Sequence, residues 1–345
     1  MVVTSLREVL RIGPTFSLLL LLGCASLQDH PEAVQLRRAQ MQMGTIVTLT
    51  AVASTEAVAQ AALTAGFKEI HRLEELLSTW IPTSELSQVN TEAGRRPVRV
   101  SPDTLFLLKR SLEITKLTDG GFNIAIGPAV QAWNVTETSR VPDQSELDKL
   151  RPTVDWTRVQ LDEEASTVFL TEPNMRVDVG GIGKGFAADR AVLAMQAAGA
   201  TDGVVALSGD IKAFGRLPDA GPFRVGIQHP RKENALLATI ELDNEAISTA
   251  GDYERFFLRD GVRYHHILDP RTLQPARGCQ SVTVIAKEGW LADGLDTGIF
   301  VMGPDRGMEL IERLPDVEGI IVDSAGNLRV SSGLKNRLHI ESSPP

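Results

Sequence analysis

The segment Val177–Arg190, with the sequence VDVGGIGKGFAADR, constrains the fold more than any other part of the chain. Its pattern predicts a strand over 175–179 and a helix over 185–198. Between the two elements lie three glycines, Gly180, Gly181 and Gly183. Glycines let backbone N–H groups approach an anion, and a helix N-terminus favours negative charge. With Lys184 as a neighbouring cation, the turn is a candidate phosphate-binding loop, and a tight packing turn is the alternative.

This turn differs from the two common nucleotide-binding loops. A Walker A loop has a glycine at the position where Asp178 stands here, and Lys184 is followed by Gly185 instead of Ser or Thr. The spacing GxGxxG is not present in the turn either. The pattern therefore indicates an anion site without assigning it to either class.

Cys24 indicates export and a lipid anchor. Arg7 and Arg11 form a weakly basic head, and Gly13–Leu22 is an apolar run shorter than the roughly 20 residues that span a bilayer. A cysteine directly after such a run is typical of a bacterial lipoprotein signal, and an ordinary signal peptide is the alternative. We expect a signal peptide over 1–23, lipidation of Cys24, and a location on the periplasmic side of the cell envelope, anchored to the inner or the outer membrane.

The sequence predicts a flexible polar tether over 24–38 and a single domain over 39–340. The formal net charge is −9, and the balance is more negative still without the weakly basic signal. An acidic chain of this kind is not expected to bind nucleic acid. If Cys24 is lipidated, Cys279 has no cysteine to pair with. The sequence contains no Cys/His cluster, so a zinc hydrolase is not expected.

The remaining patterns mix helices and strands without a regular βαβ rhythm, so the predicted fold class is α+β, with mixed sheets and packed helices. Strands are predicted at Met43–Ala53, 168–170, 203–207, 223–227, 237–242, 264–268, 281–286 and 320–322. Helices are predicted from a cap at Ser54 to near Trp80, from a cap at Ser101 to Gly120, over 291–302 and over 306–313. No internal repeat is visible.

A second candidate site is the segment ADGLDT at 292–297. Asp293 and Thr297 are four residues apart, so on a helix their oxygens face the same side, with Asp296 nearby. A carboxylate and a hydroxyl on one face suit a hard cation such as Mg²⁺. The alternative is an acidic pair that complements the positive end of a helix.

Three further segments carry polar groups that can act on a ligand. Of the neighbours His265 and His266, only one can face a given site from a strand, and a histidine near phosphates can act as acid or base. Thr249 to Tyr253 forms a polar wall at a turn, and Trp80 stands beside Ser84 and Asn90, where its ring can stack on a flat heterocycle. The alternatives are a surface histidine and a tryptophan used for core packing.

Taken in order along the chain, these segments resemble the ApbE family of flavin transferases (FAD:protein FMN transferases). The resemblance rests on MGTIVTL, STW-x-P-x-SELSQVN, TDGGFNIAIGPAVQAWN, VDVGGIGKGFAADRA, LSGDIKAFG, STAGDYERFF, YHHILDPRT, SVTV and ADGLDTGIFVMG. It covers nearly the whole chain after residue 40. It implies an ApbE-like fold, FAD as substrate, Mg²⁺ as cofactor, and transfer of FMN to a Thr or Ser hydroxyl of an acceptor redox protein, with release of AMP.

The resemblance also implies roles for individual residues. Asp293 and Thr297 would ligate Mg²⁺ with help from a backbone carbonyl near Ala187. The catalytic residues would be His266, Lys184 and Asp252. The residues expected to bind FAD are Met43, Trp80, Asn123, Gly180, Gly181, Lys184, Thr249 and His266.

The chain departs from the family pattern at four positions. Asn123 stands where the family usually has Asp, and Ala250 replaces a serine. Ser208 and Leu273 each replace a glycine. Two alternatives to the transferase remain: an Mg²⁺-dependent FAD pyrophosphatase that passes the phosphoryl group to water, and a flavin-binding lipoprotein without turnover.

Overall fold

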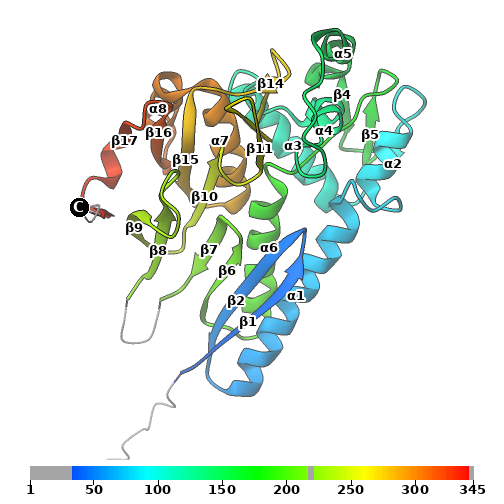
Figure 1. Ribbon diagram of the computed structural model, residues 1–345. Coiled ribbons are helices and arrows are strands. Elements are labelled where there is room, and N and C mark those ends of the chain that lie inside the picture. The colour runs from blue at the N-terminus through cyan, green and yellow to red at the C-terminus, as the bar shows by residue number, and fades with distance from the viewer. Residues whose placement is uncertain (1–32, 217–220, 342–345) are drawn as a thin grey trace, which may run out of the picture. The chain divides into compact units, whose positions relative to one another are not determined.

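The fold is built on one large antiparallel sheet. The computed structural model describes residues 33–216 and 221–341 (Figure 1). In spatial order the large sheet consists of β1 (Val34–Gln42), β2 (Thr45–Ala53), β6 (Asp202–Leu207), β7 (Asp210–Phe214), β10 (Ala246–Gly251), β15 (Cys279–Ala286), β16 (Glu318–Asp323) and β17 (Leu328–Val330). Neighbouring strands are antiparallel throughout.

Eight α-helices are present in the described ranges. They are α1 (Glu56–Leu77), α2 (Glu85–Thr91), α3 (Pro102–Leu117), α4 (Gly127–Trp133), α5 (Gln144–Leu150), α6 (Gly183–Ala197), α7 (Gly289–Met302) and α8 (Pro304–Arg313). The cap at Ser101 is confirmed, whereas the first helix is capped by Thr55 instead of Ser54 and ends at Leu77. None of the helices in these ranges is long and apolar enough to cross a bilayer.

The two faces of the large sheet are buried by different layers. Helices α1, α6, α7 and α8 cover one face, as Figure 1 shows. A small sheet covers part of the other face and contains β8 (Phe223–Gln228), β9 (Leu236–Leu242) and β18 (Leu338–Ile340). Strand β15 shows the consequence, because Val282 and Val284 pack on the helices while Ile285 packs on the small sheet. Every residue of β15 is therefore buried.

Smaller elements lie outside these layers. One three-stranded sheet contains β3 (Val98–Arg99), β5 (Thr167–Leu170) and β4 (Val159–Asp162). Two hairpins contain β11 (Phe256–Arg259) with β12 (Val262–His265), and β13 (Leu268–Asp269) with β14 (Gln274–Pro275). The 3₁₀ helices are η1 (Ile124–Ile126), η2 (Arg151–Thr153), η3 (Trp156–Arg158) and η4 (Ser332–Leu334). The mixture of separate sheets and packed helices confirms the α+β class.

Two predicted strands are wrong. Residues 175–179 join no sheet. The side chain of Asn90 makes the hydrogen bonds that a neighbouring strand would make: it accepts one from Val177 N (2.7 Å) and donates one to Val177 O (3.0 Å). The predicted strand 264–268 is broken into β12 and β13; between them, Ile267 N donates to the side chain of His265 at 3.3 Å instead of to a neighbouring strand.

The predicted tether is also shorter than expected. Strand β1 begins at Val34 and pairs with β2 over its whole length, so residues 34–38 belong to the sheet. The residues of β1 alternate between exposed and half-buried and none is fully buried, so its sequence is polar and does not have the pattern of a core strand. Cys24 and the signal peptide over 1–23 lie outside the described residues.

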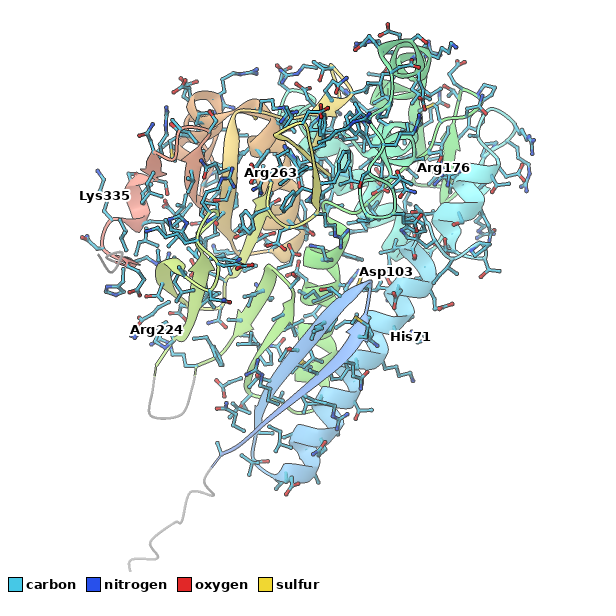
Figure 2. All side chains as sticks on the ribbon, viewed as in Figure 1. His71, Asp103, Arg176, Arg224, Arg263 and Lys335 are labelled. Carbon is cyan, nitrogen blue, oxygen red and sulfur yellow. The ribbon has the colours of Figure 1, made fainter. Side chains whose placement is uncertain are left out.

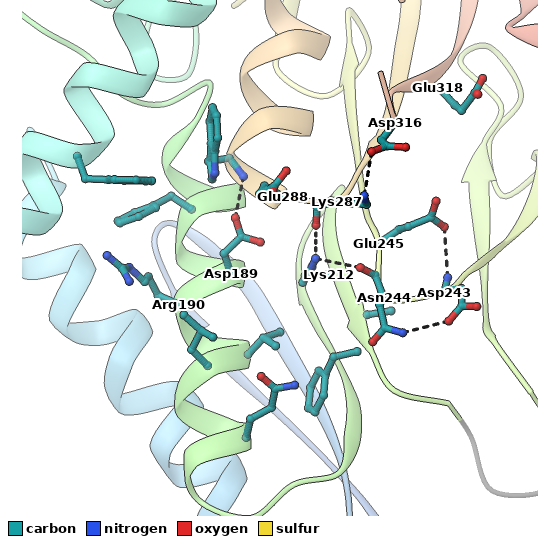
Figure 3. Close-up of a pocket in the computed structure, with 18 of the residues that line it drawn as sticks. Asp189, Arg190, Lys212, Asp243, Asn244, Glu245, Lys287, Glu288, Asp316 and Glu318 are labelled. Carbon is teal, nitrogen blue, oxygen red and sulfur yellow. Dashed lines mark hydrogen bonds and ion pairs between the residues drawn. The ribbon is translucent and has the colours of Figure 1, made fainter. Parts of the chain in front are cut away.

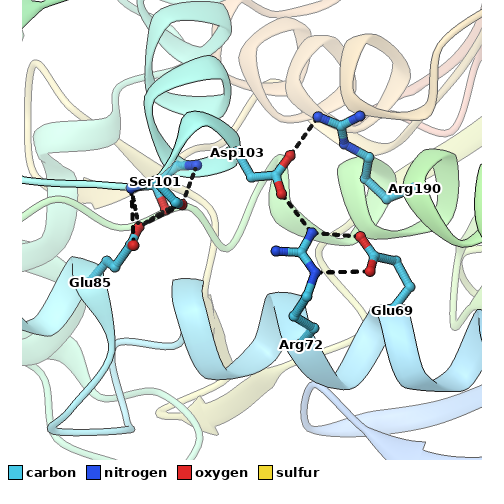
Figure 4. A network of polar contacts seen from close by, with 7 residues as sticks. Glu69, Arg72, Glu85, Ser101, Asp103 and Arg190 are labelled. Carbon is cyan, nitrogen blue, oxygen red and sulfur yellow. Dashed lines mark hydrogen bonds and ion pairs between the residues drawn. The ribbon is translucent and has the colours of Figure 1, made fainter. Parts of the chain in front are cut away.

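Charged side chains connect three of the helices. Asp103 at the start of α3 accepts hydrogen bonds from Arg190 on α6 and from Arg72 on α1, both at 2.5 Å (Figure 4). Arg72 is also held by Glu69 at 2.9 Å. Nearby, Ser101 N and Oγ both donate to the carboxylate of Glu85, which joins the caps of α2 and α3.

Loss of the Ser101 hydroxyl tests this joint. We expect Ser101→Ala to lower the free energy of unfolding by about 1–2 kcal/mol, because Thr104 N loses its cap and Glu85 loses a donor. Urea unfolding followed by circular dichroism measures the change. Ser324→Ala, in an exposed turn, is the matched control, and an equal loss in both variants would contradict the prediction.

Candidate active site

Helices α6 and α7 approach each other so closely that their backbones touch. A Cβ placed on Gly185 would lie 2.1 Å from Gly289 O, and one placed on Gly289 would lie 2.5 Å from Gly185 O. No L side chain fits at either position without moving a helix. The contact brings the first turn of α6, which carries Lys184, next to the side chains of α7.

Three buried carboxylates converge at this contact. Asp293 and Asp296 come from α7, and Asp210 is the first residue of β7. Each offers a carboxylate oxygen, and these oxygens lie within 4.8 Å of one another. Asp293 Oδ2 accepts a hydrogen bond from Gly185 N at 2.8 Å, so the cluster is attached to the first turn of α6. We call these three residues the acidic cluster.

Two neighbours partly neutralise the acidic cluster. Lys184 Nζ forms an ion pair with Asp210, and the hydroxyl of Ser248 on β10 lies between Asp210 and Asp296, 2.6 Å from Asp296 Oδ2. One hydroxyl proton cannot be donated to two ionised carboxylates at once. One of the two carboxyls must therefore carry a proton, or a cation must compensate their charge.

The protonation of the cluster follows from its burial. Burial, followed by the charge of Asp210, raises the pKa of Asp293 to about 7. Burial and the charges of Asp293 and Asp210 raise the pKa of Asp296 well above its ordinary range. Burial lowers the pKa of Lys184, but the charges of Asp210 and Asp293 outweigh it and hold that pKa above its ordinary value. Three carboxylates facing one ammonium fit a hard divalent cation, which would stabilise their ionised forms.

The glycine turn packs against Thr297, which is hydrogen-bonded to the acidic cluster. A Cβ on Gly181 would lie 2.9 Å from Thr297 Oγ1, and Thr297 Oγ1 donates to Asp296 Oδ1 at 3.2 Å. The structure thus brings together Gly181, Lys184, Asp293 and Thr297, which the resemblance placed in one site. Gly180 is exposed, and its N–H donates to Asp178 Oδ1 at 2.7 Å. Ala187 is buried in the second turn of α6, and its role as a carbonyl ligand stays a prediction.

The two neighbouring histidines have different environments. His265 is buried: its Nε2 donates to Ala276 O at 2.7 Å and its Nδ1 accepts from Ile267 N at 3.3 Å. His266 is half-buried, and its Nδ1 lies 3.3 Å from Arg255 O. A carbonyl oxygen can only accept, so Nδ1 carries the proton and Nε2 of His266 is left able to accept one. Burial and then the charge of Arg255 lower the pKa of His266 to about 3, with a smaller contribution from Lys184.

Asp252 and Thr249 are held by other side chains. Both carboxylate oxygens of Asp252 accept hydrogen bonds from Arg231 at 2.7 Å. A guanidinium nitrogen of Arg263, labelled in Figure 2, lies 3.7 Å from Asp252 Oδ1. Thr249 Oγ1 lies 2.9 Å from Thr283 Oγ1 on the neighbouring strand. These contacts are structural, and the predicted role of Asp252 in catalysis stays a prediction.

The other residues predicted to bind FAD lie in turns and loops. Met43, in the turn between β1 and β2, has a φ of 50° and donates its N–H to Glu74 Oε1 at 2.7 Å. Trp80 is 74% exposed, so it does not have the packing role that was its alternative. Asn123 is buried, accepts from Ala125 N at 2.8 Å and donates to Val154 O at 3.0 Å. Asn123 therefore caps η1; an aspartate could make the same cap but could not donate to Val154 O.

Two departures from the family pattern fall at positions with positive φ. Ser208 has a φ of 60° and Leu273 a φ of 58°, a region where glycine is relaxed and other residues are strained by about 1 kcal/mol. Leu273 is fully buried, and its carbonyl accepts from Trp133 Nε1 at 2.7 Å. Packing therefore offsets the backbone strain at this turn.

A cavity of about 730 Å³ lies elsewhere along α6 (Figure 3). Phe106, Phe186, Lys212, Asn244 and Trp290 are among its lining residues, and neither Lys184 nor any member of the acidic cluster lines it. Because the convergent charges and the glycine turn are elsewhere, we take the acidic cluster and not this cavity as the site of chemistry.

Comparison with known proteins agrees with the geometry. Residues 43–321 match the model of the ApbE family. The chain belongs to the ApbE family. It is 32% identical over 340 residues to the FAD:protein FMN transferase of Treponema pallidum (strain Nichols), covering 93% of each chain. It is 34% identical over 302 residues to the protein of that name from Vibrio cholerae, covering 86% of this chain and 88% of the relative.

Solved structures show the same fold. The ApbE protein from Thermotoga maritima has a TM-score of 0.81 and 30% identity, covering 88% of this chain and 98% of that one. The flavin transferase ApbE from Vibrio cholerae has a TM-score of 0.79 and 30% identity, covering 88% and 99%. These similarities confirm the resemblance, the fold and the class of enzyme: this ApbE-family chain is a transferase.

Sequence reasoning did not single out two residues of the ApbE-family site. Asp210 and Ser248 lie on strands far from the other cluster residues in sequence, and only the sheet brings them together. A signal for Asp210 was present: an aspartate that follows Ser208-Gly209 and opens a strand of otherwise ordinary β pattern.

The lowered pKa of His265 leads to a prediction about how the stability of this ApbE-family chain depends on pH. Burial lowers its pKa to about 4 from the ordinary 6.5, so between these values the unfolded chain binds a proton that the folded chain does not. As the pH falls from 6.5 to 4, we expect His265 alone to lower the free energy of unfolding by up to about 1.4 kcal/mol per pH unit. His266 acts in the same direction, whereas Asp293 and Asp296, whose pKa values are raised, act in the opposite direction.

Urea unfolding between pH 4.5 and 7.5, a range of about three units chosen to bracket the ordinary histidine pKa, measures this slope. His265→Gln should remove the contribution of His265 from it, so that the free energy of unfolding falls less, relative to wild type, as the pH is lowered. His71→Gln, which changes an exposed histidine on α1 (Figure 2), is the matched control. Equal slopes in wild type and His265→Gln would show that His265 does not cause the dependence.

Proposed function

We propose that the chain is an Mg²⁺-dependent FAD:protein FMN transferase. It would cleave the pyrophosphate of FAD, attach FMN to a Thr or Ser hydroxyl of an acceptor redox protein, and release AMP. The observation that carries this proposal is the convergence of Lys184, the glycine turn and the acidic cluster at one point. The names of the relatives supply the substrate and the group transferred.

The residues that would hold the metal are those of the acidic cluster with Thr297. Their oxygens converge, their burial disfavours three uncompensated charges, and oxygen ligands are what Mg²⁺ prefers. When bound, Mg²⁺ would neutralise charge on the pyrophosphate. Asp293 also holds Gly185 N, so the same carboxylate fixes the start of α6.

The glycine turn and Lys184 would hold the phosphates. Gly180 is exposed and Gly181 half-buried, so the backbone of the turn is open to an anion. The N-terminus of α6 adds the positive end of the helix dipole, while Gly183 N and Gly185 N are already paired with Val179 O and Asp293. Lys184 now pairs with Asp210, and a phosphate oxygen would compete for the same ammonium.

The transfer step needs a proton acceptor. The acceptor hydroxyl oxygen forms a bond to the FMN phosphorus, and the bond from that phosphorus to the bridging oxygen breaks, so AMP leaves with the electron pair. The hydroxyl proton would pass to Nε2 of His266, which the hydrogen bond from Nδ1 to Arg255 O leaves unprotonated. The lowered pKa of His266, about 3, keeps its ring neutral at pH 7 and also makes it a weak base.

We also propose that the enzyme is anchored to a membrane through lipid on Cys24 and acts on the periplasmic side of the envelope. The motif around Cys24 supports this proposal. Strand β1 begins only ten residues after Cys24, so a lipid anchor would hold the domain close to the membrane surface.

The test of the proposed function uses the purified chain, FAD, Mg²⁺ and a candidate acceptor domain with a target threonine. Intact mass spectrometry of the acceptor detects the addition of one FMN, and omission of Mg²⁺ should prevent it. Release of free FMN and AMP without a change in acceptor mass would show a pyrophosphatase instead. FAD that stays bound and intact would show a binding protein without turnover.

Asp293 variants separate metal binding from folding. We expect Asp293→Asn and Asp293→Ala each to lower the rate of FMN transfer at least about a hundredfold, because both lose a ligand charge. Asn keeps an acceptor for Gly185 N, so Asp293→Asn should keep more of the wild-type melting temperature than Asp293→Ala. Asp148→Ala, at an exposed aspartate on α5, is the matched control. Full transfer by Asp293→Asn would contradict the metal assignment.

A further inference from the structure

Helices α6 and α7 carry the same short pattern in their first two turns. Residues 185–189 read GFAAD and residues 289–293 read GWLAD, so each has a glycine, an aromatic residue, an alanine and an aspartate in the same places. The repeat was not visible to sequence analysis because it is five residues long and occurs on two different helices. In the structure the two copies meet at the contact between Gly185 and Gly289.

The two aspartates cap each other's helices. Asp293 of α7 accepts from Gly185 N in the first turn of α6 at 2.8 Å. Asp189 of α6, which Figure 3 labels, accepts from Gly289 N at 2.8 Å and from Trp290 N at 3.1 Å, in the first turn of α7. The N-cap residue of α7, Glu288, makes no side-chain cap of its own. Asp189 thus supplies the cap that α7 lacks.

The aromatic residues of the two copies share one partner. Phe106 of α3 stacks on Phe186 with ring centroids 5.7 Å apart and meets the edge of Trp290 at 6.3 Å. Arg190, next to Asp189, is bound to Asp103 of the same helix α3 at 2.5 Å. The pair of helices is therefore held by α3 in addition to the glycine contact.

We propose that Asp189 is a positioning residue that holds α7 where Asp293 and Asp296 meet Asp210 and Lys184. Asp189 and Asp293 occupy equivalent places in the repeat, but only Asp293 belongs to the acidic cluster. Asp189 acts on the site through the backbone of Gly289 and Trp290, one turn before Asp293. The part of this inference that concerns metal affinity rests on the proposed function.

The test compares Asp189→Ala and Asp189→Asn in the full chain. Asn keeps one acceptor oxygen for the α7 N-terminus, whereas Ala keeps none. Titration calorimetry with Mn²⁺ measures metal affinity, and hydrogen exchange with mass spectrometry measures protection of residues 184–186 and 289–293. Asp143→Ala is the matched control, because Asp143 caps α5 through Glu146 N at 2.8 Å and is not part of either helix.

We expect Asp189→Ala to weaken Mn²⁺ binding at least about tenfold, as loss of a group that orients metal ligands does, and Asp189→Asn to lie between it and wild type. Exchange should rise in both segments, since the two caps depend on one contact. Asp143→Ala should leave both measurements unchanged even where it lowers the melting temperature. Wild-type affinity and protection in folded Asp189→Ala would overturn the proposal.

Failure of the proposed function would look different. If the wild-type chain binds no Mn²⁺, the metal assignment is wrong, and hydrogen exchange alone decides the role of Asp189. Faster exchange in both segments would then support the positioning role, and faster exchange limited to residues 289–291 would overturn it.

Discussion

The contact between the backbones of Gly185 and Gly289 fixes the geometry of the whole site. It sets the distance between α6 and α7, and these two helices cover the centre of the large sheet. The glycine turn and Lys184 enter from α6, Asp293 and Asp296 from α7, and Asp210 and Ser248 from the sheet beneath them. A larger separation would remove the hydrogen bond from Gly185 N to Asp293 and open the cluster to water.

Concentrating charge in a buried place is costly, and the fold limits the cost in local ways. Every member of the acidic cluster has at least one partner: the backbone N–H of Gly185 for Asp293, the hydroxyl of Thr297 for Asp296, and the ammonium of Lys184 for Asp210. Partners of this kind reduce the penalty of burial without removing it. The raised pKa values of Asp293 and Asp296 show that their ionised forms still carry a free-energy penalty. A bound cation would reduce this penalty.

Local patterns in the sequence were enough for much of this picture. The turn after Val179, the helix that carries Lys184, and the pairing of Asp293 with Thr297 on one helix depend on neighbours in the chain, so they could be predicted. Asp210 and Ser248 could not, because sheet pairing brings them to the site. The segment before the turn was misread as a strand because a single amide, that of Asn90, satisfies its backbone where a strand would otherwise pair.

The meeting of α6 and α7 at their first turns has an electrostatic consequence. The N-termini of two helices point into the same region, and each contributes a macrodipole worth about half a positive charge there. Unlike Lys184 or a histidine, this potential comes from peptide groups and does not titrate. The part of the potential at the glycine turn that comes from the two helix dipoles is therefore independent of pH, whereas the part that comes from Asp293 and Asp296 changes as they titrate.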